Sequence, residues 1–235
     1  MNKKFTKADT EIQAVFFDLD GTLIDSFNDL AFALNLLLSK HNKPSIPIQE
    51  VKKYVSLGVA GLLNCAFSIT THHPQFSELK EQYLTIYKQK ISQQCTSCLY
   101  PGITTLLNEL YEKAIPWGVV TNKLRHLAEI LLEQTKIIEQ CRVLVASDDV
   151  DKPKPSPQSL LKACETLRCQ PECCVYIGDH QRDIIAGKSA HMLTISAIYG
   201  YVQENEDPYR WGATYNAKNP ADILYWLEQN QWKQP

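Results

Sequence analysis

Two aspartates separated by one residue follow the apolar run Ala14-Val15-Phe16-Phe17. Residues at a spacing of two along an extended strand point to the same side, so Asp18 and Asp20 present their carboxylates together. Two carboxylates about 4 Å apart repel by roughly 4 kcal/mol at the effective dielectric of a protein surface. One aspartate alone would fit a solvated strand end or a helix cap. The pair instead indicates a site for a cation.

Three further segments have polar residues directly after an apolar run or on a stiff loop. They are Thr121-Asn122-Lys123 after Val119-Val120, the proline-rich run 152–157 (KPKPSP), and Gly178-Asp179 after Val175-Tyr176-Ile177, with Asp183 four residues on. Each alone is compatible with a turn, a cap or a surface loop. Together they supply oxygen ligands suited to Mg²⁺, a lysine and turn N–H groups suited to phosphate, and a carboxylate suited to nucleophilic attack.

Alternating strands and helices must position these residues. The sequence predicts strands over 14–17, 117–120, 143–146, 174–177 and 193–197. Between and after them it predicts helices over 104–113, 124–134, 157–167, 182–190 and 221–229. Strands that alternate with helices of about 10 residues form βαβ units in a parallel sheet. Ligands of such sheets bind beyond the carboxyl ends of the strands, where Asp18, Thr121 and Asp179 are expected.

Residues 27–92 have a different pattern. The segments 29–41, 47–67 and 76–91 all have helical periodicity, and prolines separate them. We therefore expect an all-helical domain over 27–92, inserted into an α/β core formed by 14–26 and 93–235.

The composition is that of an ordinary globular protein, with 44% hydrophobic and 21% charged residues. The 24 basic and 26 acidic residues give a net charge of −2, so no nucleic-acid partner is expected. No apolar run has the length of a membrane span, and residues 1–13 lack the apolar core of a secretory signal, so we expect a cytoplasmic protein without a membrane partner. Nothing in the sequence indicates an oligomeric state. Cys95 and Cys98 form one CxxC among eight cysteines; reduced thiols are favoured over a metal or redox role.

Taken together, the motifs resemble those of the haloacid dehalogenase (HAD) superfamily of phosphohydrolases. DLDGTL, VVTNK, KPSP and GDHQRD match its four motifs in order, and the resemblance runs from about residue 14 to 229. Within the superfamily the chain is most similar to phosphoglycolate phosphatases and the related N-acetylmuramic acid 6-phosphate phosphatases. The segment 199–213 (YGYVQENEDPYRWGA) resembles the latter branch. The resemblance implies a Rossmann-like core with a helical cap inserted after the first motif.

The resemblance also implies residue roles. Asp18 would be the nucleophile and Asp20 the general acid/base. Mg²⁺ would be bound by Asp18, the backbone carbonyl of Asp20 and Asp179, with Asp183 as an outer-sphere support. The phosphate would be held by Thr121, Asn122 and Lys154; Lys154 is preferred to Lys152 because its distance to Gly178 matches that in relatives. Leu57-Gly58 stands where relatives often have paired glycines, so the substrate loop of the cap departs from the family pattern.

The expected function is that of a magnesium-dependent phosphatase that hydrolyses a small phosphorylated metabolite through an aspartyl-phosphate, in the manner of phosphoglycolate phosphatases. The first alternative substrate is N-acetylmuramic acid 6-phosphate or another sugar phosphate, and a phosphoryl mutase would need a sugar bisphosphate. An alternative of another class is a phospho-accepting signalling module. Such modules also combine acids, a threonine and a lysine, but they are shorter and lack the second acid of the DxD pair, here Asp20.

Overall fold

A computed structural model gives the structure of the protein and describes residues 11–230. Its centre is a six-stranded sheet in the order β5-β4-β1-β6-β7-β8, and every neighbouring pair is parallel. The strands are β1 (Ala14–Phe17), β4 (Trp117–Val120), β5 (Leu144–Val145), β6 (Cys174–Gly178), β7 (Leu193–Ala197) and β8 (Tyr215–Ala217). The chain moves outward from β1 through β4 to β5 and returns beside β1 at β6. This order brings the carboxyl ends of β1, β4 and β6 together.

Five helices cover the two faces of the sheet. They are α5 (Ile103–Glu112), α6 (Arg125–Gln134), α7 (Gln158–Leu167), α8 (Gln181–Ser189) and α9 (Pro220–Gln229). Alternate residues of β1 face opposite sides: Phe16 packs with residues of α7 and α8, whereas Phe17 packs with residues of α5, α6 and α9. Because both faces are buried, β1 is a continuous apolar run rather than an alternating one.

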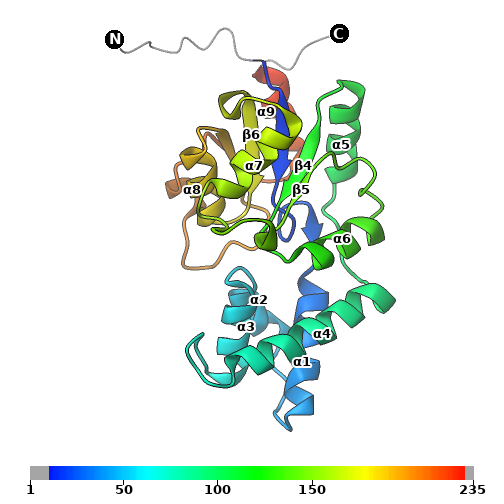
Figure 1. Cartoon of the computed structure of the whole chain (residues 1–235), viewed down its shortest axis with the longest axis vertical. Coiled ribbons are helices and arrows are strands. Elements are labelled where there is room, and N and C mark those ends of the chain that lie inside the picture. The colour runs from blue at the N-terminus through cyan, green and yellow to red at the C-terminus, as the bar shows by residue number, and fades with distance from the viewer. Residues whose placement is uncertain (1–10, 231–235) are drawn as a thin grey trace.

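Four further helices form a separate layer at one end of the sheet, drawn in blue to green in the lower half of Figure 1. They are α1 (Phe27–Lys40), α2 (Ile48–Val55), α3 (Gly58–Phe67) and α4 (Phe76–Gln94). We call these four helices and their connections the cap. The chain passes from the core to the cap through β2 (Ile24–Asp25) and returns through β3 (Cys98–Leu99), which pair antiparallel. The predicted fold class, a Rossmann-like parallel core with an all-helical cap, is confirmed.

The main differences from the expected elements lie in short segments. The sequence-based analysis missed β2, β3 and β8, and it treated 47–67 as one helical segment. The structure divides that segment into α2 and α3, because Gly58 has a φ of +66° and cannot continue a right-handed helix. The domain boundaries at 26/27 and 92/93 stay a prediction, and residues 231–235 of the expected core lie outside the described range.

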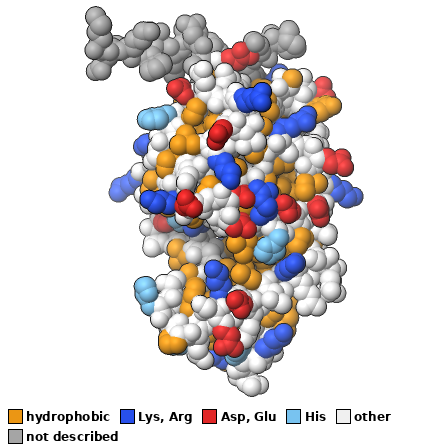
Figure 2. Space-filling view, in the orientation of Figure 1, with side chains coloured by type: hydrophobic (Ala, Val, Ile, Leu, Met, Phe, Trp, Pro, Cys, Tyr) orange, Lys and Arg blue, Asp and Glu red, His pale blue; other side chains and the backbone are white. Residues whose placement is uncertain are grey.

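The visible surface carries acidic and basic side chains that are interspersed rather than gathered into one basic face (Figure 2). Within residues 11–230, none of the helices has both the length and the apolar character that crossing a bilayer requires.

Candidate active site

Three buried carboxylates meet at the carboxyl ends of β1 and β6. Asp18 directly follows β1, Asp179 directly follows β6, and Asp183 lies in the first turn of α8. One carboxylate oxygen of each lies within 4.8 Å of those of the other two. Burial, together with the negative charges of Asp18 and Asp183, raises the pKa of Asp179 well above its usual range. The charged form of Asp179 is therefore disfavoured within the buried cluster.

The backbone approaches this cluster closely. A Cβ atom on Gly21 would lie 2.0 Å from Oδ2 of Asp179, and Gly21 has a φ of +84°. The same Oδ2 accepts a hydrogen bond from the backbone N–H of Tyr201 at 2.8 Å, and the hydroxyl of Thr22 donates to Oδ1 at 3.4 Å. Gly21 thus follows the DxD pair because no side chain fits between the turn and Asp179.

Lys154 places a fully buried ammonium group among the carboxylates. Its Nζ lies 3.0 Å from Oδ1 of Asp18 and 2.7 Å from Oδ1 of Asp183. It also donates to the hydroxyl of Tyr176 at 2.6 Å and to the carbonyl of Val120 at 3.0 Å. The structure thus brings Lys154 into the predicted site.

Neighbouring residues fix the positions of these groups. The side-chain amide of Asn122 donates to the carbonyl of Lys154 at 2.9 Å and accepts from its backbone N–H at 3.0 Å. Asn122 therefore holds the lysine loop with its side chain, which leaves its backbone for a ligand. The backbone N–H of Leu19 donates to Oδ1 of Asp18 at 2.8 Å. Thr121, at the end of β4, lines the same cavity as Asp18.

Asp20 has a different environment from Asp18. Its carboxylate accepts two hydrogen bonds from Nζ of Lys123, at 2.8 and 2.9 Å, and one from the hydroxyl of Ser26. Nζ of Lys123 also lies 4.7 Å from the centre of the Tyr87 ring, which belongs to cap helix α4. The Asp20 side chain is thus held at the boundary between core and cap, apart from the three-carboxylate cluster.

The cluster has the chemistry of a site for a hard cation. All three side chains offer oxygen, which is the ligand type that Mg²⁺ prefers. A divalent ion would offset the burial and the carboxylate repulsion that raise the pKa of Asp179. Of the residues expected to bind Mg²⁺ through their carboxylates, the structure brings Asp18 and Asp179 together. Asp183 lies in the same group, and its Oδ2 also accepts a hydrogen bond from the N–H of His180 at 3.0 Å.

A cavity of about 450 Å³ extends from this cluster to the cap. Its core side carries Asp18, Asp20 and Thr121, and its cap side is mainly apolar. The cap residues that line it include Leu57, Gly58, Val59, Leu62, Phe76, Lys80 and Leu84. The expected substrate loop, Leu57-Gly58, therefore lies across the cavity from the aspartates. Leu57 is 47% exposed.

Two hydrogen bonds connect this loop to the core. A guanidinium nitrogen of Arg182, on α8, donates to the carbonyl of Ser56 at 2.6 Å. The side-chain amide of Gln203 donates to the hydroxyl of Ser56 at 2.9 Å. The segment before Leu57 is therefore bound to the same helix that carries Asp183.

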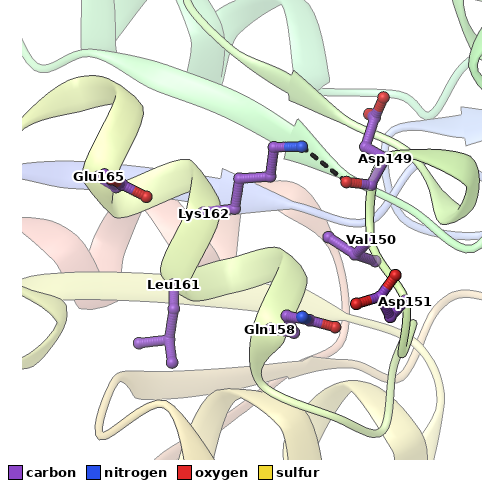
Figure 3. Close-up of a pocket in the computed structure, with 7 residues that line it drawn as sticks. All are labelled: Asp149, Val150, Asp151, Gln158, Leu161, Lys162 and Glu165. Carbon is purple, nitrogen blue, oxygen red and sulfur yellow. Dashed lines mark hydrogen bonds between the residues drawn. The ribbon is translucent and has the colours of Figure 1, made fainter.

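A second cavity, of about 430 Å³, lies between α7 and the segment 149–151 (Figure 3). Acidic side chains of Asp149, Asp151 and Glu165 line it, and Nζ of Lys162 donates to the carbonyl of Asp149 at 2.6 Å. None of the residues predicted to act on phosphate lines this cavity. The candidate active site is therefore the cavity between core and cap.

Sequence-based reasoning missed several residues that complete the site. They are Ser26, Lys123, Tyr176, Arg182, Tyr201 and Gln203. Lys123 belongs to the predicted segment Thr121-Asn122-Lys123, but no role was assigned to it. Ser26, Tyr176 and Arg182 lie within or close to the predicted motifs, yet their residue types alone indicate no role. Tyr201 and Gln203 reach the site from the segment that follows β7.

A parallel sheet with carboxylates at the adjoining ends of β1 and β6 and a helical cap over them defines a capped Rossmann-like α/β protein. The family model of haloacid dehalogenase-like hydrolases matches residues 15–197, and the chain belongs to this family. It is 33% identical over 218 residues to N-acetylmuramic acid 6-phosphate phosphatase of Pseudomonas aeruginosa, covering 93% of this chain and 96% of the relative. It is 34% identical over 223 residues to phosphoglycolate phosphatase of Xanthomonas campestris pv. campestris, covering 95% and 98%.

Solved structures agree with the fold. A crystal structure from Haemophilus somnus, described as a predicted phosphoglycolate phosphatase, superposes with a TM-score of 0.81 at 25% identity and covers 94% of this chain and 98% of its own. CbbY from Rhodobacter sphaeroides in complex with phosphate has a TM-score of 0.76 at 22% identity, covers 92% and 99%, and shares the fold. The expected resemblance to the HAD superfamily is confirmed.

Proposed function

We propose that this protein is a Mg²⁺-dependent phosphatase that hydrolyses a small phosphorylated metabolite through an aspartyl-phosphate on Asp18. Its family and its relatives named as phosphatases support the enzyme class, which was expected from the sequence. The observation that carries the mechanism is the position of Asp18. Its Oδ1 is held by Lys154 and by the N–H of Leu19, on a cavity that Asp20 also lines.

In the first half-reaction, a carboxylate oxygen of Asp18 forms a bond to phosphorus while the bond from phosphorus to the leaving oxygen breaks. Asp20, acting as the general acid, donates a proton to that leaving oxygen. Lys154 offsets the negative charge of Asp18 and of the phosphoryl oxygens, and the hydroxyl of Thr121 and the backbone after it donate hydrogen bonds to those oxygens. Mg²⁺ held by Asp18 and Asp179 would supply further positive charge to stabilise the phosphoryl oxygens.

In the second half-reaction, Asp20 accepts a proton from a water molecule, and the water oxygen attacks phosphorus. The bond between Asp18 and phosphorus breaks, which releases inorganic phosphate and restores the carboxylate of Asp18, and Asp20 again carries the proton that it donated in the first half-reaction. This step distinguishes a phosphatase from a phospho-accepting signalling module. Asp20 lies two residues after the nucleophile, and Lys123 and Ser26 hold its carboxylate in place. This position favours hydrolysis.

The core residues of the site bind the phosphoryl group, so the cap forms the wall of the cavity that faces the leaving group. We propose that the segment 27–92 acts as this cap domain and that Leu57-Gly58 is its substrate loop. The cavity of about 450 Å³ is within the range of sites for sizeable ligands, and its cap side is mainly apolar. This volume is large enough for a hexosamine phosphate such as N-acetylmuramic acid 6-phosphate. Such a compound is therefore a second candidate substrate beside the smaller phosphoglycolate.

The test is a comparison of kcat/KM for phosphoglycolate, N-acetylmuramic acid 6-phosphate and p-nitrophenyl phosphate, each with Mg²⁺. Hydrolysis of all three, with one metabolite preferred by about tenfold or more, supports the proposal and selects its substrate class. A phosphoprotein that accumulates without release of phosphate would instead indicate the signalling module.

The variant Leu57→Gly tests whether the cap selects the leaving group. Removing this exposed side chain widens the cavity opposite Asp18, so the ratio of kcat/KM between phosphoglycolate and the hexosamine phosphate is expected to change. Hydrolysis of p-nitrophenyl phosphate should change much less. An equal change on all three substrates would mean that the loop affects closure rather than selection.

A further inference from the structure

Three cysteine thiols meet at the opposite end of β6 from the carboxylates. Cys164 lies in the last turn of α7, Cys169 follows the end of that helix, and Cys174 begins β6. The Sγ atoms of Cys164 and Cys174 lie 3.8 Å apart, and those of Cys174 and Cys169 lie 3.3 Å apart. All three Sγ atoms lie within 4.8 Å of one another.

The spacing of the three sulfur atoms fits a single ion bound between them. In tetrahedral zinc sites the Zn–S bonds are about 2.3 Å, which places neighbouring sulfur atoms about 3.8 Å apart. The 3.8 Å separation of Cys164 and Cys174 matches that value, the 3.3 Å separation of Cys169 and Cys174 is shorter, and all three sulfur atoms lie within 4.8 Å of one another. One ion can therefore contact all three sulfurs after small side-chain movements. Thiolates are soft ligands that select Zn²⁺ and Cu⁺ over the hard Mg²⁺ expected at the aspartates.

An ion can reach the cluster from one side. The thiol of Cys169 donates to the carbonyl of Cys164 at 3.7 Å, and the thiol of Cys174 donates to the carbonyl of Gln170 at 3.1 Å. Cys164 and Cys174 are buried, whereas Cys169 is partly exposed and lines a cavity of about 470 Å³ with Arg168.

We propose that Cys164, Cys169 and Cys174 form a three-thiolate site for a thiophilic d¹⁰ metal ion, Zn²⁺ or Cu⁺. Each thiol releases its proton when the ion binds. A water molecule from the cavity beside Cys169 completes tetrahedral Zn²⁺, whereas Cu⁺ needs no fourth ligand. The ion joins the end of α7 to the start of β6. Its role is to stabilise the fold, and phosphatase activity does not require it.

The contrasting interpretation is that the thiols are reduced side chains packed in the core, as free cysteines often are. The experiment uses the full chain, reduced by a phosphine, freed of metal and kept in excess Mg²⁺. Co²⁺ serves as the spectroscopic probe, because thiolate ligands give it a near-ultraviolet charge-transfer band that carboxylates do not. The affinities of the protein for Zn²⁺ and for Cu⁺ are then measured separately, each in competition with a chromogenic chelator. The ion for which the protein competes more effectively with the chelator is assigned to the site.

We expect one equivalent of Co²⁺ to produce the charge-transfer band, and Zn²⁺ or Cu⁺ to displace it. At a free concentration about 100 times its Kd, the bound ion should raise the Tm by roughly 5 to 10 °C. The variant Cys169→Ser should weaken binding by roughly two orders of magnitude or more. This substitution is chosen because Cys169 is partly exposed, so that the fold is retained. Activity on p-nitrophenyl phosphate should stay within about twofold of the wild type.

The matched control is Cys173→Ser, which alters a buried thiol next to Cys174 that is not part of the cluster. It should bind the ion as the wild type does, and so should the double variant Cys95→Ser/Cys98→Ser. The proposal is overturned if the wild type gives no charge-transfer band with Co²⁺. It is also overturned if Cys169→Ser binds as tightly as the wild type, or if the Cys95/Cys98 variant abolishes binding.

Discussion

Replacing Lys154 removes the ammonium group that forms ion pairs with the buried carboxylates of Asp18 and Asp183. Nζ lies 3.0 Å from Asp18 and 2.7 Å from Asp183, which corresponds to roughly 5 to 6 kcal/mol of Coulomb attraction per pair at an effective dielectric of about 20. Desolvation offsets much of this attraction, but removing one partner of a buried pair still costs about 3 to 5 kcal/mol of stability. Loss of a positive charge at the phosphoryl group should also lower kcat about 100- to 1,000-fold. We therefore expect Lys154→Met to impair both stability and turnover.

The matched control is Lys152→Ala on the same loop. The side chain of Lys152 is exposed, so its removal should change the unfolding free energy by no more than about 0.5 kcal/mol and leave kcat nearly unchanged. Urea unfolding and steady-state kinetics on p-nitrophenyl phosphate measure the two effects separately. The reasoning is refuted if Lys154→Met keeps activity within about tenfold of the wild type, or if Lys152→Ala is the more damaging change.

Three further predictions follow from the same structure. Asp18→Asn should abolish turnover with an unchanged circular dichroism spectrum, because an amide is not a nucleophile; activity within about tenfold would contradict the mechanism. Chelation of divalent metal should stop hydrolysis, Mg²⁺ should restore it and excess Ca²⁺ should inhibit it; full activity in a chelating buffer would exclude a metal role for Asp179. Burial opposes the charge of Asp29, but hydrogen bonds from Ser97 and Thr96 outweigh this effect and lower its pKa below 3.8. Asp29→Asn should therefore lose about 1.5 to 3 kcal/mol at pH 7, and urea unfolding across a pH series should show this difference vanish as the pH falls below 3.8 through the pKa in the folded protein. A difference that persists at lower pH would contradict the charged state of Asp29.

The sheet was predictable where strands are buried on both faces. β1 and β4 have the bounds expected from the sequence. A short apolar run that ends in polar residues can adopt few structures other than a buried strand. β8 was missed because Tyr215-Asn216-Ala217 has no strand pattern of its own, and its conformation depends on pairing with β7.

The same distinction holds for the site. The sequence predicted the carboxylates, since each directly follows or lies close to a strand end in a parallel sheet. It also predicted Lys154, but not the groups that hold the cap loop beside these residues. The hydrogen bonds to Ser56 from Arg182 and Gln203 join residues 126 and 147 positions apart. Such contacts arise from the packing of the cap on the core, to which no local pattern refers.

The two crossings between core and cap lie side by side, since Ile24 of β2 pairs with Leu99 of β3. An insertion whose two ends lie side by side leaves the fold of the core intact, as a long loop between two strands of a hairpin does. The cap can therefore change its sequence, size or packing without moving Asp18 relative to Lys154. In this architecture the residues of the carboxylate site and the cap surface proposed to select the substrate are free to diversify at different rates.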